Sequence, residues 1–230
     1  MKVFAISDLH LSANVDKPMD IFGGAWDNYW EIIKNNWVKH VDEEDVVLIS
    51  GDISWAMYLE DAVADLKEIG ELPGHKVIIK GNHDYWWNSV TKVKEILGRK
   101  SYVIQNDALK IGSFVFLGTR GWNCPDKAWT EQDEKIYLRE GQRLALSIAA
   151  ANKIKEDGDT FVGMMHFPPF NVRREDSIFT KTFEESGIRT VVYGHLHGKN
   201  CRVSPKVVKN GVSYYLTSCD QVNNMLVRLF

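Results

Sequence analysis

Short apolar runs alternate with stretches of helical spacing through the first 100 residues. The apolar runs cover residues 2–7, 46–50 and 76–80, and their length and uniform apolarity predict buried strands. Between them, the regions of about residues 26–40, 58–69 and 88–97 place apolar side chains three and four positions apart, as expected of helices packed on a sheet. This alternation predicts an α/β fold with parallel strands joined by crossover connections.

The pattern changes near residue 102, where short strand-like segments follow one another closely. Residues 102–104, 108–111 and 113–118 are separated by Asn106-Asp107 and by Gly112, which favour turns, so a second and partly antiparallel sheet is expected. A polar, Trp-containing loop then leads into a helical stretch of about residues 133–155. Further strand-like runs lie at residues 160–165, 189–193, 206–208, 212–217 and 225–230.

The chain of 230 residues contains no internal repeat, low-complexity tract or linker rich in Pro, Gly and Ser. We therefore expect a single domain over residues 1–230, with a polar and helical insertion at about residues 119–157. Its three cysteines, Cys124, Cys201 and Cys219, are odd in number and include no CxxC pair. This pattern predicts free thiols in a reducing compartment.

Charge and hydropathy indicate which kind of substrate and which location to expect for this protein. The formal net charge is -3, whereas proteins that bind long nucleic acids usually carry an excess of Lys and Arg, so a small substrate is favoured. The first apolar run ends at Ser7-Asp8 and is too short for the core of a signal peptide. No segment approaches the ~18 apolar residues of a membrane span. We expect a cytoplasmic protein with no membrane partner, and the sequence predicts no oligomeric state.

Polar side chains follow each strong apolar run at its carboxyl end. The clusters are Asp8-Leu9-His10, Gly51-Asp52, Gly81-Asn82-His83-Asp84, His166 and Gly194-His195-Leu196-His197-Gly198. Five of the seven histidines belong to these clusters, and only His40 and His75, in polar surroundings, lie outside them. In open α/β sheets, ligands bind in the crevice at the carboxyl ends of the strands. We therefore expect these segments to converge on one site.

Each cluster also has a purely structural interpretation. Asp8 and Asp52 could cap a helix or a turn, and Asn82 could hold a left-handed turn. A single histidine is more often a core or surface residue than a ligand. However, five separate strand ends would then have acquired metal-binding residue types independently. A shared metal site is the better interpretation of the set.

Two pairs of candidate ligands stand two positions apart in extended segments. Residues i and i+2 of a strand point to the same face, about 6.6 Å apart. Asp8 with His10, and His195 with His197, have this spacing. Such pairs can reach two neighbouring metals, which lie ~3.5–4 Å apart in two-metal hydrolases. Carboxylate, imidazole and amide ligands without thiolate suit Mn, Fe or Zn rather than a structural zinc site.

In this order, the motifs D-x-H, G-D, G-N-H-D, H and G-H-x-H resemble those of the calcineurin-like metallophosphoesterase superfamily, over residues 8–198. The resemblance implies a four-layer sandwich of two mixed β-sheets flanked by helices. It also implies two divalent metal ions at the strand ends, with manganese first and iron or zinc as alternatives. One metal would be bound by Asp8, His10, Asp52 and His197, and the other by Asp52, Asn82, His166 and His195.

The resemblance further assigns roles within G-N-H-D. His83 would face the substrate as general acid or charge stabiliser and Asp84 would orient its ring, whereas the structural alternative is an ordinary Asn-His-Asp turn. The implied reaction is hydrolysis of a phosphoester by a hydroxide that bridges the two metals. We expect a small phosphodiester or nucleotide-like substrate, with a phosphomonoester as the alternative. A nuclease or a non-catalytic scaffold of the same fold is less favoured.

Aromatic and basic residues near the motifs leave further alternatives open. Trp55, Trp86 and Trp87 lie beside the motifs, and Trp122 and Trp129 lie in the polar insertion. Aromatic side chains beside a phosphate site can stack on a base, although packing is the preferred interpretation. Arg173-Arg174 could contact a second phosphate, but a solvated pair is preferred. Residues 119–128 could form a lid over the site or an ordinary surface loop.

Overall fold

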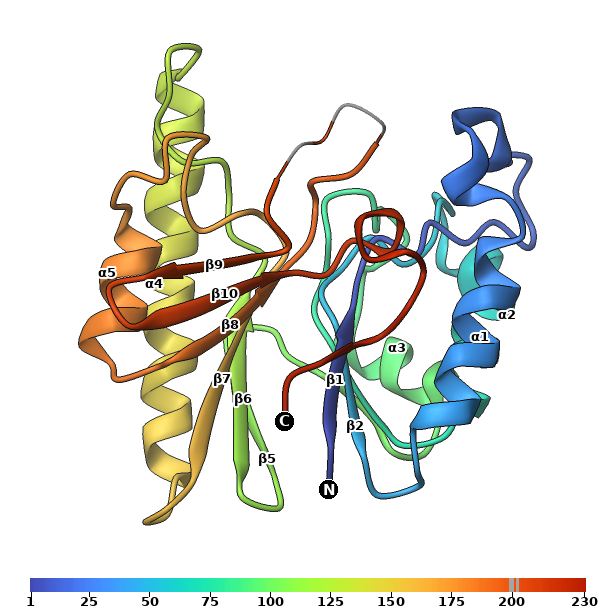
Figure 1. Cartoon of the computed structure of the whole chain (residues 1–230), viewed down its shortest axis with the longest axis horizontal. Coiled ribbons are helices and arrows are strands. Elements are labelled where there is room, and N and C mark those ends of the chain that lie inside the picture. The colour runs from blue at the N-terminus through green and yellow to red at the C-terminus, as the bar shows by residue number, and fades with distance from the viewer. Residues whose placement is uncertain (199–200, 202) are drawn as a thin grey trace.

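The computed structural model describes residues 1–198, 201 and 203–230, and it consists of four layers in the order helices, sheet, sheet, helices (Figure 1). One outer layer contains α1 (Tyr29–His40), α2 (Leu59–Glu71) and α3 (Val90–Leu97). The other contains α4 (Glu131–Ile154) and α5 (Ile178–Glu185). The α/β sandwich of two mixed sheets expected from the sequence is therefore confirmed.

The first sheet has the strand order β11-β1-β2-β3-β4. Its strands are β1 (Val3–Ile6), β2 (Val46–Ile49), β3 (His75–Ile78), β4 (Ser101–Val103) and β11 (Val227–Arg228). All neighbours are parallel except β11, which runs antiparallel to β1 at one edge. The strands β1 and β2 are buried along their whole length, which explains why they appear in the sequence as continuous apolar runs rather than alternating ones.

The second sheet has the strand order β5-β6-β7-β8-β10-β9. Its central strands β6 (Phe114–Thr119), β7 (Thr160–Met165), β8 (Thr190–Tyr193) and β10 (Val212–Leu216) are parallel. The edge strands β5 (Ala108–Ile111) and β9 (Lys206–Lys209) are antiparallel to their neighbours. Residues 119–157 were expected to form a polar and helical insertion, and their helix is α4. This helix packs on the outer face of the second sheet.

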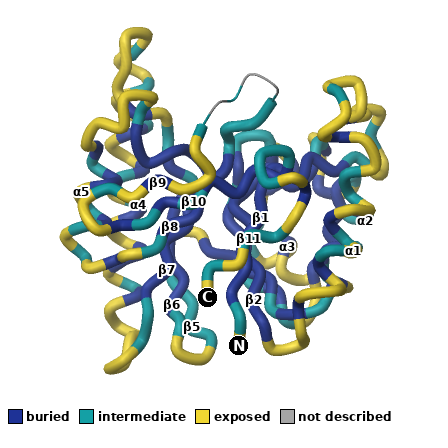
Figure 2. The backbone as a smooth tube through the Cα atoms, viewed as in Figure 1, coloured by how far each residue is buried: buried dark blue, intermediate teal, exposed yellow. Residues whose placement is uncertain are grey.

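Apolar side chains fill the three spaces between the four layers. Trp37 of α1 packs with the outer face of the first sheet, and Phe179 and Phe183 of α5 pack with the outer face of the second. A third cluster, which includes Val3 and Phe116, lies between the two sheets. Figure 2 shows the same division, with buried strands in the middle and exposed loops at the periphery. Packing of both faces of both sheets fixes the strand ends that carry the polar clusters.

The structure differs from the sequence-based expectation in two elements. Residues 102–104 form β4 of the first sheet, where Tyr102 pairs in parallel with Val77, rather than the start of the second sheet. The last strand, which the sequence assigned to neither sheet, is β11 of the first sheet. Helix α5 was not predicted, although Ser177 and Thr180 form a capping box at its start. Its eight residues show too few apolar repeats to reveal the helical period.

The three cysteines are free, as expected from the sequence. Among the residues that the structure describes, none of the helices is both long and apolar enough to cross a lipid bilayer.

Candidate metal centre

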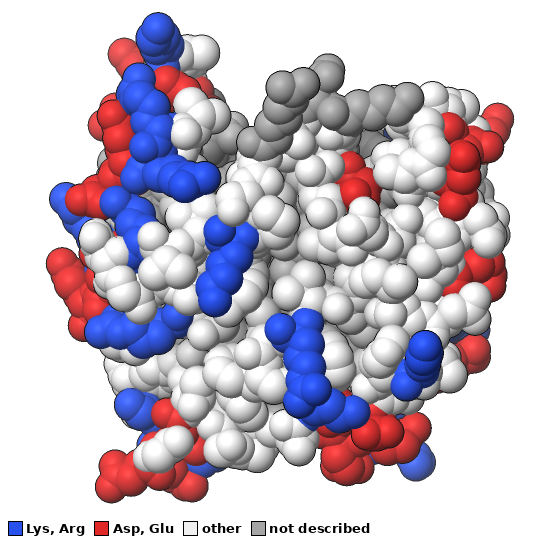
Figure 3. Space-filling view, viewed as in Figure 1, with Lys and Arg blue, Asp and Glu red and all other residues white. Residues whose placement is uncertain are grey.

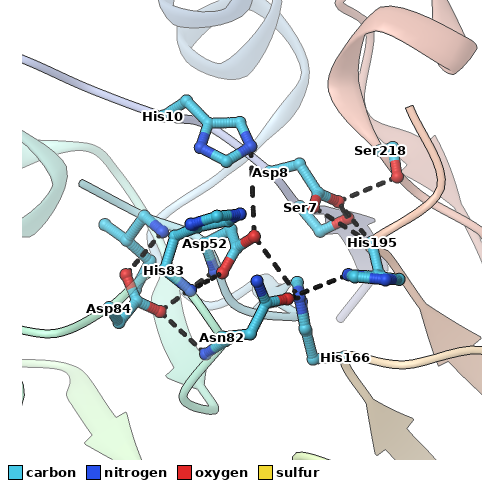
Figure 4. A network of polar contacts seen from close by, with 12 residues as sticks. Ser7, Asp8, His10, Asp52, Asn82, His83, Asp84, His166, His195 and Ser218 are labelled. Carbon is cyan, nitrogen blue, oxygen red and sulfur yellow. Dashed lines mark hydrogen bonds and ion pairs between the residues drawn. The ribbon is translucent and has the colours of Figure 1, made fainter. Parts of the chain in front are cut away.

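The predicted ligands lie together where strands of both sheets end, and Figure 4 shows all of them except His197. They follow five parallel strands: Asp8 and His10 come after β1, Asp52 after β2, Asn82 after β3, His166 after β7, and His195 and His197 after β8. The carboxyl ends of parallel strands meet at one edge of a sheet, so the topology itself brings these residues together. The convergence expected from the sequence is thus observed.

Two groups of these side chains have the geometry of metal sites. The ligand atoms of Asp8, His10 and His197 lie within 4.8 Å of one another, and so do those of Asp52, His166 and His195. The side-chain oxygen of Asn82 joins the second group, 2.6 Å from His166 Nε2 and 2.9 Å from His195 Nδ1. This division agrees with the two ligand sets that the motifs imply.

Asp52 lies between the two groups. Its Oδ2 atom is 4.0 Å from Nε2 of His10 and 3.4 Å from Nε2 of His166, and all three side chains are fully buried. Its other oxygen, Oδ1, accepts the backbone N–H of His83 at 2.8 Å. A carboxylate held in this way can offer Oδ2 to metals on both sides.

Several buried atoms of the site lack a hydrogen-bond partner. Within the described part of the chain, both ring nitrogens of His10 and Oδ2 of Asp52 are buried and unpaired. An unpaired buried polar atom costs about 1–3 kcal/mol, so such atoms normally have a partner. Imidazole nitrogen and carboxylate oxygen are ligand types of Mn, Fe and Zn. These residues therefore fit the divalent metal ions that the motifs imply.

Burial and charge set the protonation of the ligands. Burial lowers the pKa of His10 and of His195 to about 3, so both rings are neutral at pH 7, the form that binds metals. Burial would also lower the pKa of His166, but the Asp52 carboxylate outweighs it and raises that pKa to about 9. Burial opposes ionisation of Asp52 in turn, yet His166 holds the pKa of that carboxyl well below its usual range.

Four candidate ligands have left-handed backbone conformations. The φ angles are 55° at Asp8, 47° at His10, 52° at Asp52 and 69° at His195. This region costs a non-glycine residue about 1–3 kcal/mol and persists only where the surrounding structure enforces it. At Asp8, His10 and Asp52 the loops after β1 and β2 enforce it, because His10 N–H donates to the carbonyl of Asp52 at 3.0 Å. At His195 the backbone N–H is held by the carboxylate of Asp8.

Two glycines allow the loops after β2 and β3 to touch. A Cβ on Gly51, whose φ is 89°, would lie 2.6 Å from Gly81 Cα and 2.9 Å from His166 Nδ1. A Cβ on Gly81 would overlap Oδ1 and the backbone nitrogen of Asp52. The glycines of the G-D and G-N-H-D motifs are therefore required by close backbone approach.

Hydroxyl groups that the sequence analysis did not single out support Asp8. Its Oδ2 accepts hydrogen bonds from Ser7 Oγ at 2.6 Å and from Ser218 Oγ at 2.8 Å. Such partners orient a metal ligand and are part of the site. Ser7 is adjacent to Asp8 and could have been considered, whereas Ser218 follows β10, 210 positions away, and no motif indicates it.

His83 lies beside the two groups of ligands and belongs to neither. Its ring packs against Trp55, with 4.6 Å between centroids, and is 5.7 Å from the ring of His10. Burial lowers its pKa, although the ring remains partly exposed. This position is open to a substrate bound at the ligands, and the catalytic role of His83 stays a prediction.

Asp84 does not have the contacts expected of it. Its carboxylate accepts the backbone N–H groups of Asp52 at 3.0 Å, Ile53 at 2.8 Å and Gly81 at 2.8 Å. Among the described residues, no hydrogen bond joins it to the ring of His83, so the predicted orienting contact is not formed. Burial raises the pKa of Asp84 to about 6, which leaves it mostly ionised at pH 7. Its observed role is to fasten the loops after β2 and β3 together.

The tryptophans beside the motifs have different environments. Trp86 and Trp87 are 1% and 6% exposed and pack in the core under the first sheet, which confirms the packing interpretation for both. Trp55 instead stacks on the ring of His10, with 4.5 Å between centroids, and Lys17 Nζ lies 4.8 Å from its ring centre. Trp55 therefore forms a wall of the site.

Comparisons with known proteins agree with this geometry. A family model described as calcineurin-like phosphoesterase matches residues 1–199. The Gene 66 protein of Mycobacterium phage D29 is 26% identical over 234 residues, which covers 97% of this chain and 95% of the phage protein.

Solved structures share the fold. Phosphopantetheinyl hydrolase from Mycobacterium tuberculosis has a TM-score of 0.56 at 12% identity, covering 100% of this chain and 95% of that one. A protein of unknown function from Aquifex aeolicus has a TM-score of 0.52 at 13% identity, covering 99% and 95%. At these identities, the two structures support the fold alone.

Proposed function

The chain belongs to the calcineurin-like phosphoesterase family, and on this premise we propose that it hydrolyses a small phosphodiester or nucleotide-like substrate with the help of two divalent cations. Phosphoester hydrolysis is supported by the family and by the two groups of ligand atoms. Manganese is the proposed metal, and the same ligand atoms would also accept iron or zinc.

The position of Asp52 is the observation that supports binding of two metal ions rather than one. One buried carboxylate oxygen faces His10 of one group and His166 of the other, and it has no hydrogen-bond partner within the described residues. A single metal ion would lie on only one side of Asp52, beside either His10 or His166. Two cations that share Asp52 would occupy both positions.

Each ligand has a place in this arrangement. Asp8, His10, Asp52 and His197 would hold one cation, and Asp52, Asn82, His166 and His195 would hold the other. When bound, two divalent cations activate water for attack on phosphorus and neutralise the phosphoryl oxygens. The neutral amide of Asn82 limits the negative charge of the site, which leaves a net positive charge for an anionic phosphoester.

His83 is the proposed proton donor to the leaving group. It lies outside the ligand groups and is partly exposed beside them. Burial lowers its pKa, so the free ring is neutral at pH 7. A bound anionic phosphoester favours the protonated ring, because an opposite charge nearby stabilises the charged form. His83 would then donate its proton to the leaving oxygen.

Charge favours a small substrate. The formal net charge is -3, and on the face seen in Figure 3 the Lys and Arg side chains alternate with Asp and Glu around a largely uncharged middle. A protein that tracks a long polyanion usually presents a continuous basic surface. A phosphomonoester is the second candidate substrate. A phosphopantetheinyl ester, the group named for the Mycobacterium tuberculosis hydrolase, belongs in the test panel.

The test compares an aryl phosphodiester with an aryl phosphomonoester, using metal-stripped protein reloaded with manganese. We expect the diester to be hydrolysed faster, with two manganese ions bound per chain. Asp52→Asn, which keeps the size of the side chain, should abolish turnover and lower the metal content. Faster turnover of the monoester would reverse the order of the substrates. Two bound metals without turnover of any ester would contradict the enzymatic proposal.

A further inference from the structure

A cavity of about 410 Å³ lies at the carboxyl end of the second sheet. Its walls come from residues 123–133, from residues 168–174 and from the segment after β8 that contains Leu196. Small-molecule sites have volumes of ~300–1,000 Å³, so the cavity is large enough for an organic group. Part of the loop that the sequence presents as a possible lid forms one of its walls.

Two loops that carry candidate ligands also carry side chains that line the cavity, although none of the candidate ligands lines it. Leu196 lines the cavity and directly follows His195, and Pro168 lines it two positions after His166. Phe167, between the two, packs on the ring of His195 with 4.2 Å between centroids. The same two loops therefore present ligands to the metals and side chains to the cavity.

The lining includes apolar side chains that solvent can reach. Val172 is 87% exposed, and Trp129 is only partly buried. The Trp129 ring is fixed edge-on against Tyr137, with 5.3 Å between centroids, so it forms a rigid surface. Phe170 provides a buried apolar floor. Covering such surfaces with an apolar ligand is favourable, because it removes apolar area from water.

Charge in the lining argues against a second phosphate. The charged side chains of the cavity are Asp126, Asp133 and Arg174, so acidic groups outnumber basic ones. Arg173, the neighbour that could have added positive charge, is held by Glu175 through bonds of 2.9 Å and 3.0 Å. Arg173 is thus neutralised by an ion pair, and contact of the Arg173-Arg174 pair with a second phosphate stays a prediction that this charge pattern does not favour. The cavity favours an uncharged occupant.

We propose that this cavity binds the organic group of the phosphoester substrate, and that this group is uncharged and largely apolar, such as an aromatic ring system. The assignment rests on the proposed phosphoesterase function, because the phosphoryl group has to be held at the adjacent ligands. It makes residues 123–133 and 168–174 determinants of substrate choice rather than of the chemical step.

The experiment measures binding of two phosphonates, whose C–P bond resists hydrolysis, to the manganese-loaded protein by calorimetry. Methylphosphonate and naphthylmethylphosphonate differ only in the organic group. Val172→Asp places a charge at the cavity, and Ala128→Trp fills part of it from an exposed position. The matched control is Val208→Asp, on β9 outside the cavity, where the side chain is 66% exposed.

We expect the wild type to bind naphthylmethylphosphonate at least tenfold more tightly than methylphosphonate. Val172→Asp and Ala128→Trp should each reduce this preference at least fivefold, with methylphosphonate binding unchanged, and Val208→Asp should behave as the wild type. Equal affinity of the wild type for both phosphonates, or an undiminished preference in both cavity variants, would overturn the cavity assignment alone. If neither phosphonate binds but the aryl phosphodiester is hydrolysed, the cavity assignment fails and the proposed function stands, whereas absence of both binding and hydrolysis overturns both.

Discussion

The carboxylate of Asp8 accepts the backbone N–H of His195 through both of its oxygens, each at 3.0 Å. The two residues are 187 positions apart, and they follow β1 of the first sheet and β8 of the second. The bond therefore joins the sheets at the edge where the ligands gather. Because Asp8 and His195 belong to different ligand groups, it also sets the position of one group relative to the other.

Gly194→Ala tests this connection without removing a ligand. A Cβ at Gly194 would overlap Ser7 Oγ and come into close contact with Asp8 Oδ2, so the His195 N–H would be displaced. Loss of such supporting contacts typically costs about 10–100-fold in metal affinity, and we expect a decrease in this range. Titration with manganese, followed by electron paramagnetic resonance, measures it.

The matched control for Gly194→Ala is Gly24→Ala. A Cβ at Gly24 meets its nearest neighbour at 3.6 Å, an ordinary contact, and the position is remote in sequence from the ligand clusters. Unchanged manganese affinity in Gly194→Ala would show that the two ligand groups do not depend on this bond.

His83→Ala should lower kcat and leave the metal content intact. Proton transfer by a positioned side chain typically contributes ~10²–10⁴-fold, and we expect a loss of this size. The bond from the His83 backbone N–H to Asp52 does not involve the ring, so the position of Asp52 should be preserved. His40→Ala is the control, since the His40 ring is exposed on α1. Loss of manganese from His83→Ala would mean that the ring is a ligand.

The candidate ligands were predictable because each one follows closely on a recognisable strand. Asp8, Asp52 and His166 come within three positions of the ends of buried strands, and parallel topology then requires their convergence. The position of a residue just after a strand therefore predicts that it lies near residues that are far away in the sequence. Ser218 also follows directly on a strand, because β10 ends at Leu216, but serine is not a usual metal-ligand type, so the sequence contains no signal for its contact with Asp8.

Hydrogen bonds between a side chain and backbone groups of a distant loop could not be predicted from the sequence either. The family resemblance implied that Asp84 orients the His83 ring, whereas its carboxylate accepts backbone N–H groups of residues 52–54, 30–32 positions away, and of Gly81. The short strand β4 was placed in the wrong sheet for a related reason. Its three residues show no pattern that distinguishes a parallel from an antiparallel neighbour.

Asp84→Asn should destabilise the protein. An amide NH₂ would replace one carboxylate oxygen and face backbone N–H groups that need an acceptor. We expect the free energy of unfolding to fall by about 2–4 kcal/mol, since buried donors lose a charged partner. Urea unfolding measures it, with the exposed Asp16→Asn as control. Lower turnover at unchanged stability would instead support an effect of Asp84 on the His83 ring.

Lys76 provides a stability test far from the proposed chemistry. Its side chain is buried on β3, and Nζ donates hydrogen bonds to the carbonyls of Gly70 at 3.0 Å, Leu72 at 2.8 Å and Gly74 at 3.0 Å. Replacing it by methionine leaves these carbonyls without their donor. We expect Lys76→Met to lower the free energy of unfolding at pH 7 by about 2–3 kcal/mol, measured by urea unfolding.

The pH dependence of this difference follows from the pKa of Lys76, which burial lowers from 10.5 to about 8. Between pH 8 and pH 10.5 the unfolded chain binds the proton that the folded protein has lost, so the contribution of Lys76 to stability rises with pH. We expect the stability of the wild type relative to Lys76→Met to increase by about 1–3 kcal/mol across this window. Comparison with the variant removes the effects of the other lysines, because both proteins contain them. A difference that stays constant or shrinks as the pH rises would show that the folded protein keeps the Lys76 ammonium fully charged against the three carbonyls.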